Sequence, residues 1–176
     1  GSGAASECWF GGKQRQTEPN IDAMETCVTF TWMQLNKRLL EITGKPVYAE
    51  NIEKSIFNAL LASMKCDGTE IVKYLPLEGF RMGADGQCDM PLHCCNANAP
   101  RAFAMIPRYA YRVQDGAVDV NLFTPSSAEV KVGKNVVKLT MTTDYPQKGN
   151  SEITVKCKKK LAFAIRVRIP KWAEDV

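Results

Sequence analysis

The sequence lacks several features that would place it at once in a functional class. No apolar run in its 176 residues approaches the ~20 that span a bilayer, which excludes an integral membrane protein. The balance of 23 Lys and Arg against 19 Asp and Glu leaves a net charge of only +4, too weak to argue for a nucleic-acid partner. The single histidine, His93, cannot supply a hydrolase triad by itself. What remains is a globular protein, 45% hydrophobic and 24% charged.

Cysteine, by contrast, is abundant. The chain has 7, an odd number that cannot all pair internally, and Cys94 and Cys95 are adjacent, which disfavours a disulfide between them. Thiolates that bind a metal or take part in chemistry therefore fit better than a disulfide scaffold. The cysteines outside the clusters described below are interpreted as packing or loop thiols: Cys8, Cys66, Cys88 and Cys157.

Three helices are predicted before residue 110. Residues 24–42 combine apolar side chains with good helix formers, and Gly44 and Pro46 end this helix and start the next. Asn98 is predicted to cap a third helix that carries Pro100 in its first turn. The second helix, which Gly68 ends, shows the clearest apolar repeat, at every fourth position: Tyr48, Ile52, Ile56, Leu60 and Met64.

Beyond residue 111 the apolar period changes from 3.6 to 2, with turn signals at Gly116, Gly133 and Gly149. This alternation is typical of an antiparallel β-sandwich. The alternating segments are 118–122, 130–132, 137–141, 153–157 and 163–169. We therefore expect an α+β chain, with a helical part at 1–112 and a partial β-sandwich at 113–176. Neither part has enough elements to close a core, so we expect an internal segment of a larger protein.

Two clusters of residues could together bind a metal ion. Glu25 and Cys27 lie at the start of the first predicted helix, and Cys94 and Cys95 precede the third. One carboxylate and three thiolates could complete a tetrahedral Zn²⁺ site, because zinc accepts oxygen and sulfur donors. The spacing matches no standard zinc finger, however, and buried structural thiols are the alternative interpretation.

Two further side chains are candidates for chemistry. Glu7 precedes Trp9 and Phe10, whose apolar rings could raise the pKa of its carboxyl group and make it a general acid at neutral pH. The alternative is an exposed loop carboxylate. His93 neighbours Cys94, but neighbours in sequence rarely face each other, so we expect it to lie behind the ligands or to contact substrate.

Four motifs, taken in order, resemble the β-L-arabinofuranosidase family of glycoside hydrolases, family 127, also called DUF1680. They are residues 6–12 (SECWFGG), 24–27 (METC), 94–98 (CCNAN) and 119–123 (DVNLF). The resemblance implies a catalytic (α/α)6 toroid followed by a β-sandwich. Residues 1–112 would form the C-terminal portion of the toroid, and residues 113–176 the start of the sandwich.

The resemblance also implies roles for individual residues. Glu25, Cys27, Cys94 and Cys95 would ligate Zn²⁺, with Cys94 also the nucleophile and Glu7 the general acid/base. The activity implied is a retaining hydrolase that releases terminal β-L-arabinofuranosyl residues from plant glycans. The alternative function is a non-catalytic carbohydrate-binding or interaction module with a structural zinc–thiolate site.

The same interpretation fixes the expected partners and setting. The partner would be an oligosaccharide or plant glycan, with no nucleic acid and no membrane span. The remainder of the same polypeptide would be needed to complete both domains, so the isolated segment is expected to be inactive. A soluble protein of a bacterial periplasm or cytoplasm is expected, and the sequence does not distinguish the two compartments.

Overall fold

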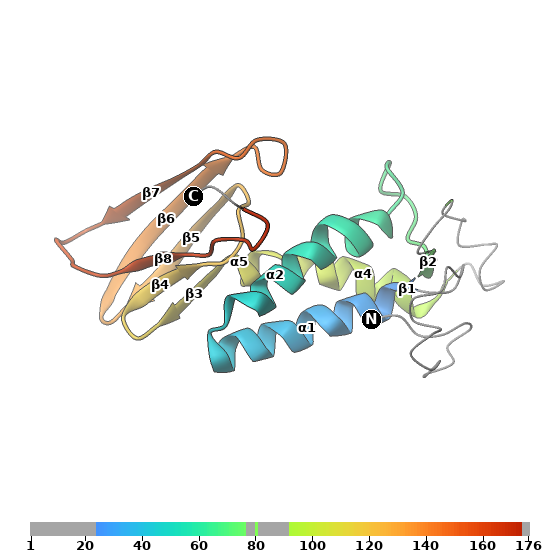
Figure 1. The fold of residues 1–176 in the computed structure, drawn as a ribbon, viewed down its shortest axis with the longest axis horizontal. Helices are drawn as coiled ribbons and strands as arrows, with labels where there is room; N and C mark the ends of the chain where they lie inside the picture. Colours follow the sequence, from blue (N-terminus) through green and yellow to red (C-terminus); the bar gives the residue numbers. More distant parts are fainter. Residues whose placement is uncertain (1–23, 77–79, 81–91, 174–176) are drawn as a thin grey trace. The chain divides into compact units, whose positions relative to one another are not determined.

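A computed structural model describes residues 24–76, 80 and 92–173 and contains both helices and strands (Figure 1), which confirms the predicted α+β class. The chain divides into two compact units, Gly1–Met105 and Ile106–Val176, each described here by itself. The predicted domain boundary at residues 112–113 stays a prediction. Among the described residues, no helix combines the length and apolar character needed to cross a membrane.

The first unit is built on a helical hairpin. Helix α1 (Thr26–Thr43) and helix α2 (Pro46–Ser55) lie side by side (Figure 1). Gly44 ends α1 as expected: its φ of 67° is left-handed, and its N–H donates to the carbonyl of Leu40 at 2.9 Å. Pro46 occupies the first turn of α2, where its missing N–H costs no hydrogen bond.

The second predicted helix contains a wider turn. Directly after α2, the chain continues as a π-helical turn, η2 (Ile56–Leu60). Apolar residues four apart drift around a helix of 3.6 residues per turn, and one wider turn corrects that drift. Accordingly Ile52, Ile56 and Leu60 are all buried. The four-residue spacing therefore predicted the helix. The π-turn keeps the apolar residues at this spacing on one buried face of the helix.

Helix α4 (Cys94–Met105) begins five residues earlier than a helix capped by Asn98 would. Asn98 lies inside the helix and does not cap it, so that prediction was wrong. Asn96 caps the helix instead: its side-chain Oδ1 accepts from the backbone N–H of His93 at 2.8 Å, while its backbone N–H donates to the His93 carbonyl at 3.0 Å. The correction places Cys94 and Cys95 in the first turn of a helix.

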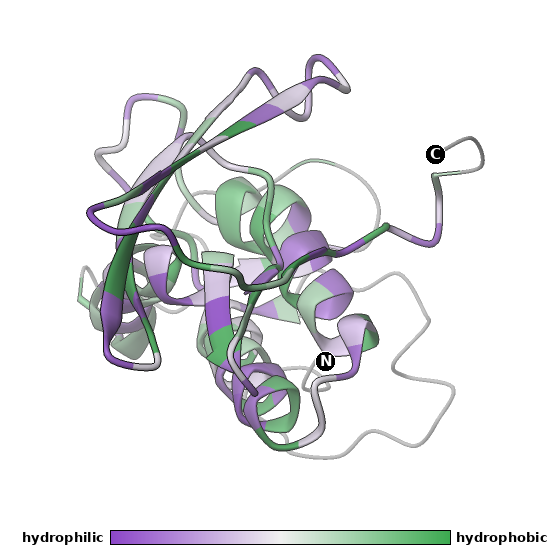
Figure 2. Cartoon of the chain, turned by 90° about the vertical axis from the view of Figure 1, so that its left-hand side faces the viewer, coloured by the Kyte–Doolittle hydropathy of each residue, from purple (hydrophilic) through white to green (hydrophobic). Residues whose placement is uncertain are grey.

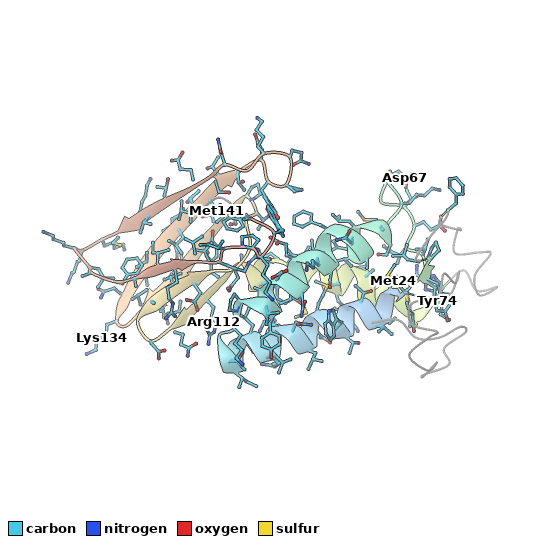
Figure 3. All side chains as sticks on the ribbon, viewed as in Figure 1. Met24, Asp67, Tyr74, Arg112, Lys134 and Met141 are labelled. Atoms are coloured by element: carbon cyan, nitrogen blue, oxygen red, sulfur yellow. The ribbon has the colours of Figure 1, made fainter. Side chains whose placement is uncertain are left out.

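A short antiparallel strand pair completes the described part of the first unit. Strand β1 (Met24–Glu25) pairs with strand β2 (Tyr74–Leu75), and Glu25 lies opposite Tyr74. Figure 3 labels one residue of each strand, Met24 in β1 and Tyr74 in β2. The helices carry hydrophilic and hydrophobic residues side by side (Figure 2), as amphipathic elements do. Buried apolar side chains come from α1, α2, η2 and α4: Met33, Leu40, Ile52, Leu60, Cys95, Ala99 and Ala102.

The second unit begins with a short helix and contains two three-stranded sheets. One has the order β3-β4-β8 and the other β5-β6-β7. Val118, Val132, Val137 and Leu139, drawn from both sheets, form one buried cluster. The elements are α5 (Pro107–Ala110), β3 (Tyr111–Gln114), β4 (Ala117–Val120), β5 (Ser126–Val132), β6 (Asn135–Thr143), β7 (Ser151–Cys157) and β8 (Ile165–Val167).

One strand pairing differs from the expected antiparallel pattern. Strand β8 runs parallel to β4, with Val118 opposite Ile165, whereas the other pairs in this unit are antiparallel. The chain reaches β8 after passing through the whole of the other sheet, and such a long connection permits a parallel neighbour. Period-2 alternation identified β4 to β8 but not β3, for which no strand was predicted, and it carries no information about which strand lies beside which.

Candidate metal centre

Four predicted ligands come together in the first unit. The ligand atoms of Glu25, Cys27, Cys94 and Cys95 all lie within 4.8 Å of one another. Cys27 Sγ lies 3.2 Å from Cys95 Sγ, and Cys94 Sγ lies 3.8 Å from Glu25 Oε1. Sulfur binds zinc at about 2.3 Å, so two sulfurs on one tetrahedral ion lie ~3.8 Å apart. The four donors are therefore close enough together to hold one metal ion.

The strand-to-helix junction positions the first two ligands. Glu25 ends β1, and Cys27 is the second residue of α1. Between them, Thr26 is 1% exposed, and it donates its N–H to the Lys73 carbonyl and its hydroxyl to the Val72 carbonyl, both at 2.9 Å. These two bonds fix the junction to the chain that leads into β2. Sequence reasoning missed Thr26, because a buried hydroxyl between two ligands leaves no periodic signal.

The first turn of α4 supplies the other two ligands. Successive residues of a helix point about 100° apart, so the adjacent cysteines occupy different environments. Cys95 is fully buried, and its Sγ lies 3.8 Å from the Lys73 carbonyl oxygen, whereas Cys94 is exposed. The Cys-Cys pair thus gives the cluster one inner sulfur and one sulfur that is open to solvent in the described part of the chain.

Burial governs the protonation of the two inner thiols. It raises the pKa of Cys27 to about 11, although hydrogen bonds with Asn98 and Cys95 act in the opposite direction. Burial, reinforced by the neighbouring Cys27, also raises the pKa of Cys95. Both thiols are therefore protonated at neutral pH when no cation is near. A divalent cation would favour their thiolate forms, which is how metal binding and thiol ionisation are coupled.

His93 has a structural role through its backbone. Its peptide N–H and carbonyl make the two hydrogen bonds with Asn96 that start α4. The His93 residue is 8% exposed, and in the described part of the chain no hydrogen bond joins its imidazole to the four candidate ligands. Burial lowers its pKa, and the Lys73 ammonium group acts in the same direction. Its expected place behind the ligands or against substrate stays a prediction.

Glu7, the predicted acid/base, lies outside the described residues, as do the neighbouring Trp9 and Phe10. Its role as the general acid/base therefore stays a prediction. Asn98 was missed as a member of the site: sequence reasoning assigned it to a helix cap, whereas its amide nitrogen lies 3.2 Å from Cys27 Sγ.

The buried hydrogen bonds of Thr26 lead to a prediction about stability. Thr26→Val keeps the shape of the side chain but leaves the buried Val72 carbonyl without its hydroxyl donor, so we expect a loss of about 1–2 kcal/mol in unfolding free energy. Denaturant unfolding of the full-length protein measures it. The control is Thr31→Val, on the same helix, whose exposed hydroxyl donates to the Cys27 carbonyl one turn away. Equal stability of the two variants would contradict the role given to Thr26.

Comparison with known proteins identifies the family. Residues 1–108 match the model of the β-L-arabinofuranosidase GH127 catalytic domain, and residues 117–176 match that of the GH127 middle domain. The chain belongs to glycoside hydrolase family 127. This confirms the resemblance drawn from the four motifs. The cluster of Glu25, Cys27, Cys94 and Cys95 lies within the part matched by the catalytic-domain model.

Individual proteins similar to this chain include a curated relative and a solved structure. The chain is 26% identical over 167 residues to a non-reducing end β-L-arabinofuranosidase of Bifidobacterium longum, covering 85% of this chain and 24% of that protein. A solved GH127 β-arabinofuranosidase is 28% identical, with a TM-score of 0.80 over 97% of this chain and 26% of the other. The chain therefore spans about a quarter of the length of these relatives.

A crystal structure of a GH127 β-L-arabinofuranosidase from Geobacillus stearothermophilus T6 has a TM-score of 0.81 to this chain. The match covers 99% of this chain and 29% of the other, at 24% identity. At that identity the likeness concerns the fold alone. It shows that the described helices and strands follow an arrangement seen in a GH127 crystal structure.

Proposed function

We propose that this chain is the part of a retaining glycoside hydrolase that carries the nucleophile and the metal ligands. The substrate proposed is a plant glycan with terminal β-L-arabinofuranosyl residues. The observation that carries the proposal is the convergence of one carboxylate and three thiols within 4.8 Å, in a chain of family 127. The relative described as a non-reducing end β-L-arabinofuranosidase supports the choice of sugar.

The metal proposed is Zn²⁺, with Glu25, Cys27, Cys94 and Cys95 as its ligands. Three sulfur donors and one carboxylate oxygen suit zinc better than calcium or magnesium, which prefer oxygen. When bound, zinc would hold the cysteines as thiolates at neutral pH. Zinc would be needed to ionise these thiols at neutral pH because burial raises the pKa of Cys27 and Cys95.

Exposure distinguishes the proposed nucleophile from the other sulfurs. Cys95 is fully buried and Cys27 is partly buried, whereas Cys94 is exposed in the described part of the chain. A sugar can therefore approach Cys94 more readily than the other two. A purely structural thiolate site needs no exposed sulfur, so this difference favours catalysis over the alternative of a non-catalytic carbohydrate-binding module.

The proposed reaction is a double displacement. The Cys94 thiolate attacks the anomeric carbon and forms a C–S bond as the bond to the leaving oxygen breaks. Glu7 gives its proton to that oxygen. In the second step the Glu7 carboxylate takes a proton from water, whose oxygen attacks the same carbon and releases the thiolate. Two inversions leave the anomeric configuration retained.

The domain arrangement is also part of the proposal. Residues 1–112 would be the end of an (α/α)6 toroid and residues 113–176 the beginning of a β-sandwich. The separate matches to catalytic and middle domains and the division into a helical and a strand-rich unit support it. The remaining three quarters of the polypeptide would supply the other helices and strands, so we propose that the segment has no activity alone.

The experiment that tests the proposed function uses the full-length protein. We expect about one zinc ion per chain and hydrolysis of an aryl β-L-arabinofuranoside with retained configuration. Elemental analysis measures the metal, and NMR of the first product formed gives the anomeric configuration. Zinc without hydrolysis of any aryl glycofuranoside would instead favour the non-catalytic module.

A further inference from the structure

The three cysteines of the cluster differ in their hydrogen-bond donors. Asn98 Nδ2 donates to Cys27 Sγ at 3.2 Å, although the two residues are 71 positions apart in the sequence. Asn98 follows Cys94 by one turn of α4 and is partly buried. Among the described residues, no side-chain amide donates to Cys94 or to Cys95. One ligand sulfur is thus singled out for an N–H···S bond.

A neighbouring cation sets the orientation of this amide. Arg101 Nη1 donates to Asn98 Oδ1 at 3.3 Å. A guanidinium group can only donate hydrogen bonds, so it must face the carbonyl oxygen of the amide. The NH₂ end is then left to face the sulfur. The pair of contacts therefore determines which end of the amide points at Cys27, and the positive charge polarises its N–H bonds.

We propose that Asn98 is a positioning residue of the metal centre, which holds Cys27 in place as a ligand and lowers the charge density on its sulfur. Arg101 acts through Asn98 by orienting the amide. The inference rests on the proposed function in one respect, that the cluster binds a metal. Hydrogen bonds to ionised acceptors are roughly twice as strong as neutral ones, so this bond strengthens when Cys27 is a thiolate.

The proposal explains how three sulfurs on one ion could take different roles. The Cys27 sulfur accepts a hydrogen bond from Asn98. Cys95 is buried, and its sulfur contacts the Lys73 carbonyl oxygen. Cys94 has neither restraint in the described part of the chain; its contacts there are with the Glu25 carboxylate and with the Cys27 thiol. The electron density of Cys94 is therefore not drawn off by an amide, which suits a sulfur that must attack carbon.

Helix stability does not account for asparagine at this position. Asparagine is a poorer helix former than leucine in a helix interior. If position 98 served only to stabilise α4, leucine would therefore stabilise the helix more than asparagine does. Asn98→Leu should therefore leave α4 folded while removing the N–H···S bond. That property makes the substitution a test of metal positioning.

The test uses the full-length protein with Co²⁺ as the probe metal. In Asn98→Leu we expect Co²⁺ affinity to fall about 10–100-fold, the range seen when partners of metal ligands are removed. The sulfur-to-cobalt charge-transfer band should move to lower energy, because Cys27 becomes richer in electrons. Competition with a chromophoric chelator measures the affinity, and absorption spectroscopy measures the band.

Matched variants separate this effect from general loss of structure. Asn58→Leu is the control, because exposed Asn58 donates to the Lys54 carbonyl and belongs to another helix. It should leave affinity and spectrum unchanged. Arg101→Met should shift both in the same direction as Asn98→Leu but by less. The double variant should equal Asn98→Leu alone, since Arg101 acts through the amide.

The possible results test the role of Asn98, the role of Arg101 and the proposed metal-dependent function separately. Wild-type affinity and an unmoved band in Asn98→Leu would overturn the inference, as would an equal loss in Asn58→Leu. Additive effects of Asn98→Leu and Arg101→Met would overturn the part given to Arg101. If the unaltered protein binds no Co²⁺ and shows no charge-transfer band, the proposed metal-dependent function fails instead.

Discussion

Replacing Cys94 with serine in the full-length protein is expected to abolish hydrolysis of an aryl β-L-arabinofuranoside, lowering kcat by at least about 10³-fold. A serine hydroxyl stays protonated where a metal-held cysteine is a thiolate, so the attacking charge is lost. Cys94 is also the exposed sulfur of the cluster, and the buried Cys95 cannot take its place. Initial rates at saturating substrate measure the effect.

The control for this variant is Cys66→Ser. Cys66 is also exposed, but it lies outside the four-residue cluster, so its replacement should leave the rate unchanged. Mass spectrometry of unaltered enzyme quenched during turnover should find a glycosyl group on the peptide that contains Cys94. A Cys94→Ser enzyme with the unaltered rate would show that the nucleophile is another residue.

The convergence of the four candidate ligands could be predicted because they form two short motifs. Glu25 and Cys27 are separated by one residue, and Cys94 and Cys95 are adjacent, so only one long-range convergence had to be inferred. Apolar repeats predicted the helical hairpin and the strands β4 to β8 for a similar reason. Side-chain period reflects local geometry, and burying one face of each element imposes that period.

The features that sequence reasoning missed depend on contacts between distant residues. Asn98 and Pro100 together resemble a helix start, yet the Asn98 amide bonds to Cys27, and α4 begins at Cys94. The residues around Asn98 in the sequence contain no information about a hydrogen bond to Cys27, which is far away in the sequence. The same limit applies to β8, whose parallel partner β4 precedes it by some 45 residues.

Replacing Cys95 with serine tests the metal directly and is expected to lower zinc content and rate together. Cys95 is fully buried, and a serine hydroxyl there would stay protonated and bind zinc weakly, so we expect affinity to fall at least ~100-fold. Elemental analysis after dialysis measures the loss. Cys157→Ser, in the other unit and outside the cluster, is the control and should keep its zinc.

The two serine variants should also respond differently to added zinc. Because Cys95→Ser weakens binding without removing the nucleophile, excess zinc should restore part of its rate by mass action. The same excess should not restore Cys94→Ser, whose attacking sulfur is gone. If Cys95→Ser keeps its full zinc content and rate, then Cys95 is not a ligand. If zinc restores both variants equally, Cys94 serves the enzyme only by binding metal, and the carbon is attacked by some other group.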